Sequence, residues 1–442
     1  MPHHALAELA RSMRAPLLRL QLGSIPAVVI SKPDLAREAL TTNDAAMASR
    51  PHLLSGQFLS FGCSDVTKCL LNLANDVLCR IAFGRRFPHG KDDKLAAVLA
   101  ESQDLYAGFA IGDFFPELEP LASTLTGLRR RLKSCLADLR EDLYAGFAIG
   151  DFFPELEPLA STLTGLRRRL KSCLADLREV CDEIIEEHIS GERQCIPDDR
   201  DEDFVDILLR AQKAPDLQVP LTDDNLKSIV LDIFIAGTDT TFATIEWTMT
   251  ELMRHPRILR KAQDEVRRVV GAKGQVKESD LAELHYMRAI IKETFRLHPV
   301  VPLLVPRESI VACTLGGYDI PAKTRIFINT FAMGRDPQIW EDPLEYWPER
   351  FEIAGGEIDL KDRDYKLMPF GGGRRGCPGY TFALPTVQLT LAKLMYHFEW
   401  ALPAGLRAED ISVEESFGLA TKKEEPLFVA VRKSDMYEFK GE

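Results

Sequence analysis

The chain has 442 residues, of which 45% are hydrophobic and 28% charged. This composition suits a large buried core and excludes a disordered or fibrous protein. The formal net charge of −12 argues against nucleic acid as a partner, because nucleic-acid binding needs a basic surface. No linker rich in glycine, serine or proline divides the chain, so we expect one large domain over residues 1–442.

The first elements of the chain are predicted to be short strands. Two largely apolar runs, Leu17 to Leu22 and Ala27 to Ile30, flank a turn, and Pro33 opens a helix. From Asn72 onward helical periodicity dominates, with a brief return to strand character between Val311 and Ile328. The expected fold class is therefore mainly α with small β-sheets.

An internal duplication follows. Residues 104–141 are repeated without a change as residues 142–179, whereas the repeats of a solenoid diverge and normally number at least about three. Only one copy fills the original place in the fold, and the sequence leaves open which one. In the second copy, leucines at helical spacing from Leu163 to Leu177 continue in phase to Ile184, which predicts one continuous helix.

A long apolar helix is predicted from about Thr222 to Arg254, with Thr222 as its cap. At about 1.5 Å per residue it is roughly 50 Å long and must cross the core. Its middle carries the polar cluster Ala236-Gly237-Thr238-Asp239-Thr240-Thr241. Threonine hydroxyls that bond back to the preceding turn are one explanation, and it suits Thr238. A local opening for a small polar guest, with Asp239 and Thr240 supplying protons, explains the cluster better.

Two further groups of charged residues follow. Glu293 and Arg296 lie one helical turn apart and can pair on one face. Such a pair is common on protein surfaces. Arg350, in Pro348-Glu349-Arg350-Phe351, offers a second arginine for a buried network, which the spacing alone does not establish.

The glycine-rich loop from Phe370 to Gly379 surrounds Cys377. Its glycines, Gly373 among them, allow a tight turn and close approach to a flat ligand, and Pro378 suits the first turn of a helix. A helix that starts at Cys377 favours its thiolate, the form that binds a metal. A cysteine hydrolase is a remote alternative, because no histidine stands out in the sequence as its general base.

The remaining cysteines and the hydropathy bear on the cellular setting. Nine cysteines, an odd number without a Cys-x-x-Cys pair, fit reduced thiols that face the cytosol. The sequence lacks an uninterrupted apolar run of about eighteen residues or more, so we expect no transmembrane helix.

These motifs, in this order, resemble those of the cytochrome P-450 superfamily: Ala236 to Thr241, Glu293-x-x-Arg296, Pro348 to Phe351, and Phe370-x-x-Gly373-x-Arg375-x-Cys377-x-Gly379. The resemblance implies the cytochrome P-450 fold and haem b (iron protoporphyrin IX) held by the Cys377 thiolate, the ligand typical of this family. It also implies that Phe370, Gly373, Gly379, Ala236 and Gly237 line the haem.

The resemblance extends to the roles of the charged residues. It implies that Asp239 and Thr240 deliver protons to dioxygen, and that Arg307 and Arg375 contact the haem propionates. Glu293, Arg296 and Arg350 would then form a structural network. The implied activity is that of a monooxygenase, with O2 as co-substrate and electrons that pass from NADPH through cytochrome P-450 reductase.

The stretches Ser55 to Val66, Asp151 to Glu179 and Leu281 to Lys440 are most similar to plant microsomal members. The implied reaction inserts one oxygen atom into the indole ring of a small aromatic substrate, tryptamine. The implied location is the cytosolic face of the endoplasmic reticulum membrane, and no nucleic acid is expected as a partner.

Three features depart from the family pattern. The membrane anchor and proline-rich hinge of the plant members are absent from the start of the chain. Thr67 runs directly into Lys68, so a propionate-binding helix is expected to be deleted here. Pro385 falls within the helix after Cys377, where a proline costs roughly 3 kcal/mol or more and predicts a kink. These departures keep open an alternative, an inactive remnant that does not bind haem.

Overall fold

The computed structural model describes residues 1–22, 25–50, 166–190, 203–213, 221–353, 365–416, 418 and 420–434. The chain forms two compact units, one of Met1–Pro51, Ala137–Ala145 and Ala243–Glu442, the other of His52–Leu136 and Gly146–Phe242. The predicted deletion after Thr67 and the first copy of the duplication lie outside the described residues. The prediction of a single domain stays a prediction.

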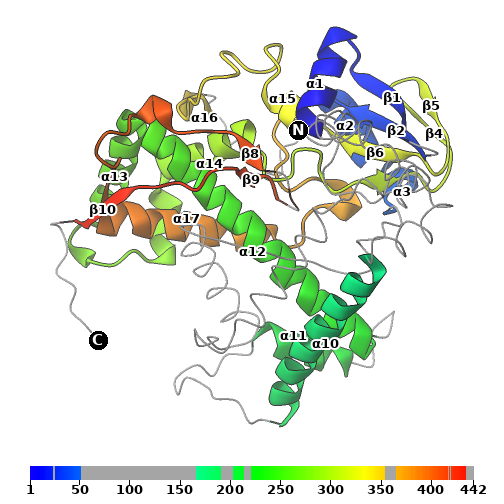
Figure 1. Ribbon diagram of the computed structural model, residues 1–442, viewed down its shortest axis with the longest axis horizontal. Helices are drawn as coiled ribbons and strands as arrows, with labels where there is room; N and C mark the ends of the chain where they lie inside the picture. Colours follow the sequence, from blue (N-terminus) through cyan, green and yellow to red (C-terminus); the bar gives the residue numbers. More distant parts are fainter. Residues whose placement is uncertain are drawn as a thin grey trace, which may run out of the picture. The chain divides into compact units, whose positions relative to one another are not determined.

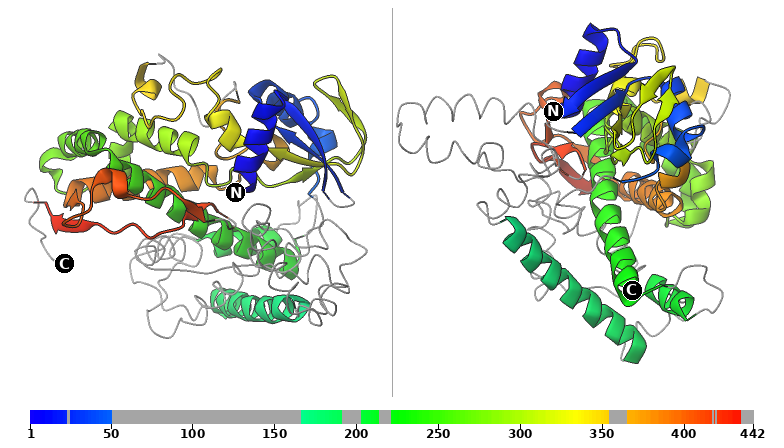
Figure 2. Two further views of the ribbon diagram at one scale, coloured as in Figure 1. Left: turned by 45° about the horizontal axis from the view of Figure 1, so that its top comes forward. Right: turned by 90° about the vertical axis from the view of Figure 1, so that its right-hand side faces the viewer.

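A four-stranded sheet in the first unit has the strand order β1-β2-β6-β3. Strand β1 (Leu17–Leu22) pairs antiparallel with β2 (Ile25–Ile30), in the register Leu17 opposite Ile30. Strand β2 is parallel to β6 (Arg325–Ile328), and β6 is antiparallel to β3 (Arg307–Glu308). Figure 2 shows helix α1 (Pro2–Ser12) beside the blue strands β1 and β2 in both views.

Helices cover this sheet and bury its apolar side chains. Val28 and Ile30 of the sheet pack with Leu40 of α2 (Pro33–Leu40) and Met47 of α3 (Asp44–Met47). Met368 joins the same cluster. This packing brings the start of the glycine-rich loop to the sheet and to α3.

The other helices of this unit (Figure 1) are α13 (Pro256–Val270), α14 (His285–Leu297), α15 (Thr330–Gly334), α16 (Arg350–Ile353) and α17 (Tyr380–His397). Helices α13, α14 and α17 contact one another. Short 3-10 helices are Gly271–Lys273, Glu278–Glu283, Gly373–Arg375 and Ala408–Asp410.

Three two-stranded ribbons complete the described part of this unit. They are β4 (Cys313–Leu315) with β5 (Tyr318–Ile320), β7 (Phe398–Ala401) with β10 (Ala430–Lys433), and β8 (Glu415–Ser416) with β9 (Lys422–Lys423).

Two helices lie in the second unit, and a third begins there. Helix α10 (Leu166–Ser190) runs without a break from the second copy of the duplication into the sequence beyond it, as the leucine spacing predicts. It is followed by α11 (Phe204–Gln212) and by α12 (Asp223–Arg254), which continues into the first unit. The N–H of Asn225 donates to the Thr222 hydroxyl at 3.2 Å, which confirms the predicted cap.

Helix α12 is the one helix, among the residues that the structure describes, with the length and hydropathy to cross a membrane. Its apolar window has a mean hydropathy of 1.3 and is 56% buried. The core helix of a globular protein can have the same length and hydropathy, and a course through the core, as predicted, explains the apolar character of α12.

Candidate functional site

The loop before Cys377 is closed by its own backbone. The Cys377 N–H donates to the Phe370 carbonyl at 2.9 Å, and the Gly376 N–H donates to the Gly373 carbonyl at 3.0 Å. The ring of Phe370 lies edge-on to Phe295, with ring centroids 5.5 Å apart. The loop is therefore anchored at both ends, with Cys377 exposed.

The helix after Cys377 begins later than predicted. Pro378 and Gly379 form a turn, and α17 starts at Tyr380. We expected the backbone N–H groups here to favour the thiolate, and those of Gly379 and Tyr380 do lower the pKa of Cys377. Burial of the sulfur acts more strongly in the opposite direction, so the net pKa is raised. A coordinated metal ion reverses this balance, because its charge deprotonates a bound thiol.

The backbone conformation and the packing of the loop require a glycine at position 373. Its φ of +65° lies in the left-handed region, and a Cβ there would be 2.5 Å from Asp44 Oδ1 and 2.7 Å from the Leu40 carbonyl. Any side chain would therefore push the loop away from α2 and α3. At Gly379, a Cβ would lie 3.8 Å from the Cys377 sulfur, an ordinary van der Waals contact. A Cβ at this position would therefore cause no steric clash.

One predicted arginine, Arg307, contacts this loop, and another, Arg375, belongs to it. Arg307 donates to Asp44 Oδ1 at 2.9 Å and to the Gly372 carbonyl at 2.5 Å. Arg375 Nε donates to the Ala48 carbonyl at 2.7 Å. Burial lowers the pKa of Arg307, Asp44 raises it, and the nearby positive charge of Arg375 lowers it further.

Arg50 is a third cation here, and it was not predicted. It donates to the carbonyls of Val305 at 2.7 Å and Pro306 at 2.9 Å. Burial and then the charges of Arg307 and Arg375 lower its pKa to about 10. No sequence pattern marks an isolated arginine before a proline, and only the bridge between Ser49 and Glu308 places it beside β3.

The three arginines and Cys377 fit the haem that the sequence implies. Among the described residues, Arg307 alone of the three arginines has a carboxylate partner, Asp44. The cluster carries more positive than negative charge and suits the propionates of a haem. Cys377, exposed in the adjoining loop, offers the sulfur ligand.

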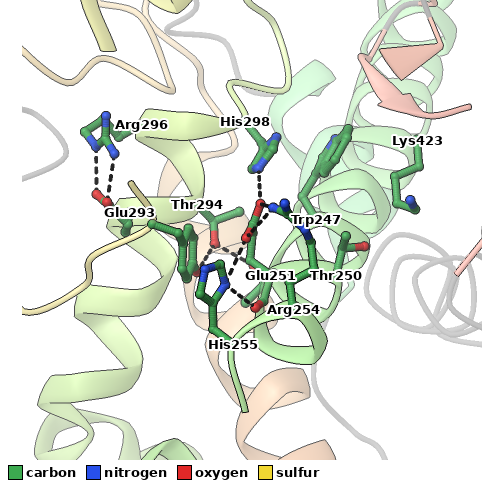
Figure 3. A network of polar contacts seen from close by, with 12 residues as sticks. Trp247, Thr250, Glu251, Arg254, His255, Glu293, Thr294, Arg296, His298 and Lys423 are labelled. Carbon is green, nitrogen blue, oxygen red and sulfur yellow. Dashed lines mark hydrogen bonds and ion pairs between the residues drawn. The ribbon is translucent and has the colours of Figure 1, made fainter. Parts of the chain in front are cut away.

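The buried network around Glu293 is formed. Arg296 donates to Glu293 from Nε at 2.7 Å and from Nη2 at 2.8 Å, a pair shown in Figure 3. Arg350 Nε donates to the same carboxylate at 3.2 Å. The Trp347 N–H adds a bond of 2.7 Å. Both Glu293 and Arg296 are completely buried as side chains, so this pair is not the common surface pair that the spacing also allows.

A second buried carboxylate, Glu251 in α12, was not predicted (Figure 3). His298 Nε2 lies 2.7 Å and Arg254 Nη1 3.0 Å from its Oε1, and His255 Nδ1 lies 3.1 Å from Oε2. Burial raises the pKa of Glu251, but its bonds to the two histidines outweigh burial and lower it overall. Because both histidines are engaged with Glu251, neither is positioned as the base of a cysteine hydrolase.

The predicted polar cluster of α12 lies in the second unit. Asp239 is buried, with 1% of its surface exposed. The Thr240 hydroxyl donates to the Ala236 carbonyl at 2.6 Å, so Thr240 forms the kind of threonine back-bond that one explanation of this cluster invokes. Gly237 lies in the same helix, between Ala236 and Thr240.

The sequence pattern of the cytochrome P-450 family matches residues 56–428. The chain belongs to this family and is a haem monooxygenase, with a mainly helical fold and small sheets as predicted. The assignment brings with it a haem cofactor, O2, electrons from a redox partner and a small-molecule substrate.

The chain is similar to tryptamine 5-hydroxylase of Oryza sativa subsp. japonica, with 66% identity over 500 residues that cover 100% of this chain and 88% of that protein. Premnaspirodiene oxygenase of Hyoscyamus muticus is 36% identical over 97% of this chain and 88% of its own length. A zebra fish cytochrome P-450 solved with abiraterone has a TM-score of 0.72 at 20% identity, covering 98% of this chain and 100% of that one. This last likeness concerns the fold alone.

Proposed function

We propose that the protein hydroxylates tryptamine at the indole ring and forms serotonin, with haem b as its cofactor. The observation that carries the proposal is the 66% identity to tryptamine 5-hydroxylase across the whole chain. One atom of O2 enters the ring, and the other leaves as water with two protons and two electrons.

Cys377 would bind the haem iron, and Arg307 and Arg375, together with Arg50, would pair with the propionates. The bound haem supplies the activation of O2. The bond from Arg307 to the Gly372 carbonyl ties the propionate site to the cysteine loop. This hydrogen bond supports the proposal that one loop positions both the iron ligand and a partner of the propionates.

Asp239 and Thr240 are the proposed proton carriers. Asp239 is buried in α12, and the Thr240 hydroxyl already donates to the Ala236 carbonyl at 2.6 Å. A hydroxyl group can donate one hydrogen bond and accept others at its oxygen. The Thr240 oxygen can therefore accept a hydrogen bond from a proton donor while its own hydroxyl donates to the Ala236 carbonyl.

The electron donor would be NADPH-cytochrome P-450 reductase, at the cytosolic face of the endoplasmic reticulum membrane. Family likeness supports both statements.

The first experiment tests haem binding. The chain is loaded with haem, reduced under carbon monoxide, and its absorption spectrum is recorded. A thiolate-type Soret band is expected, which Cys377→Ala removes and Cys313→Ala leaves intact. Folded protein without this band would refute the haem assignment and favour the inactive remnant.

The second experiment tests the substrate. Tryptamine is expected to shift the spin state of the ferric iron and, with reductase and NADPH, to yield serotonin. A normal Soret band, with a spin shift for another indole and none for tryptamine, would contradict the substrate and keep the monooxygenase class.

A further inference from the structure

Two histidines and a glutamate converge where α1 meets β8. His3 Nε2 lies 2.8 Å and His4 Nε2 lies 2.9 Å from the same oxygen, Glu415 Oε2. The start of α1, α15 and β8 are neighbours in Figure 1. None of these three residues belongs to the haem site proposed above.

Consecutive residues of a helix normally point in directions about 100° apart. Here Phe331 of α15 contacts both imidazoles. His4 stacks on its ring and His3 lies edge-on to it, with ring centroids 4.3 and 4.8 Å apart. The rings of His3 and His4 are 4.5 Å apart and nearly perpendicular. Packing therefore orients both Nε2 atoms toward Glu415.

Burial and hydrogen bonding act on the charges of His3 and Glu415. Burial, the largest effect on His3, lowers its pKa and favours the neutral ring. Burial raises the pKa of Glu415, but the bonds to the two histidines lower it overall, so the carboxylate is charged. Each Nε2 lies at hydrogen-bond distance from Glu415 Oε2, so a cation that binds here displaces the proton shared in each contact.

Arg335 is the charged group that opposes a cation here. Its guanidinium interacts electrostatically with Glu415, and burial lowers its pKa to about 10. Its charge also sits over the Phe331 ring at 3.7 Å, which partly satisfies it. Arg335 therefore weakens binding of a dication without occupying the ligand atoms.

We propose that His3, His4 and Glu415 form a binding site for a late first-row divalent cation, with Zn²⁺ as the probe. Two imidazole nitrogens and one carboxylate oxygen are a ligand set that Zn²⁺ accepts, with water in the remaining position. Metal–ligand distances of about 2.0–2.2 Å place tetrahedral ligands roughly 3.3 Å apart, so the cluster must open slightly. His4 can move, because 47% of its side chain is exposed.

The site joins segments that are far apart in the sequence. His3 and Glu415 are 412 residues apart. A bound ion would therefore clamp α1 to the ribbon of β8 and β9, and it would stabilise the folded chain, since only the folded chain assembles the ligands.

The test is zinc titration of the full, untagged chain by calorimetry, beside His4→Gln and Glu415→Gln. Glutamine keeps a hydrogen-bond donor at position 4, so His4→Gln preserves a merely structural contact. We expect each variant to weaken zinc binding by roughly tenfold or more. His285→Gln is the control, because the neighbour of the exposed His285 ring is a cation, Arg288, at 2.6 Å.

Equal zinc affinity and stoichiometry in the parent and both variants would overturn the proposal, as would a parent that binds no zinc. X-ray absorption of the zinc-loaded, unsubstituted chain identifies the zinc ligands without any variant. Scattering from two imidazoles is expected, and a sulfur shell in its place would assign the zinc to cysteine. Binding should also fall at pH 5, where protons compete for the imidazoles.

Discussion

Replacing Arg296 by methionine tests the energetic importance of the buried network around Glu293. The change removes two bonds to Glu293. It also leaves the carbonyls of Gly334, Pro343 and Glu345 without the donors that now lie 2.5, 2.6 and 2.9 Å away. Breaking a buried ion pair on one side costs about 3–5 kcal/mol, because the remaining charge stays buried.

This loss is a large part of the stability of a typical domain. At about 2–4 °C per kcal/mol for domains of roughly 150–250 residues, Arg296→Met should lower the thermal midpoint by about 6–20 °C. The midpoint is followed by far-ultraviolet circular dichroism at one scan rate, since irreversible unfolding makes it rate-dependent.

Arg407→Met is the matched control. Arg407 pairs with Asp410 at the same three-residue spacing and at 2.7 Å, but 68% of its side chain is exposed. A solvated pair contributes little, so its loss should barely move the midpoint. Equal shifts for the two variants would refute the argument that burial gives the Arg296 pair its importance.

Three further predictions concern the loop, pH and haem retention. Gly373→Ala should reduce haem loading and lower the thermal midpoint more than Gly317→Ala does, because both glycines have positive φ but a Cβ collides only at Gly373; equal effects would leave backbone strain as the sole cause. The pKa of His255 is raised by its bond to a buried carboxylate, so its contribution to stability is full below about pH 6.5 and fades as pH rises through the raised pKa. The gap in thermal midpoint between parent and His255→Gln should accordingly shrink from pH 6 to pH 9, and a gap that widens would contradict the pairing. Arg50→Gln should speed the transfer of haem to apomyoglobin, whereas Arg432→Gln, on an exposed strand, should not; equal rates would remove Arg50 from the haem site.

The elements followed from local patterns in the sequence. Strands β1 and β2 lie where the short apolar runs predict them, and helix α12 lies where helical periodicity and the Thr222 cap place it. Periodicity relates residues two to four positions apart, which is the range over which side chains share a face. The start of α17 was placed three residues too early, at Cys377 in place of Tyr380, because Pro378 also suits a turn.

Local patterns also identified the chemistry, since the glycine loop around Cys377 is one continuous segment. The sequence by itself therefore determined the family and the fold class, and it predicts Cys377 as the haem ligand. Tertiary structure decided what surrounds them. Arg307 meets Asp44 across 263 residues, and His3 meets Glu415 across 412. Such contacts depend on how sheet, helices and ribbons pack together, and no spacing along the chain encodes them.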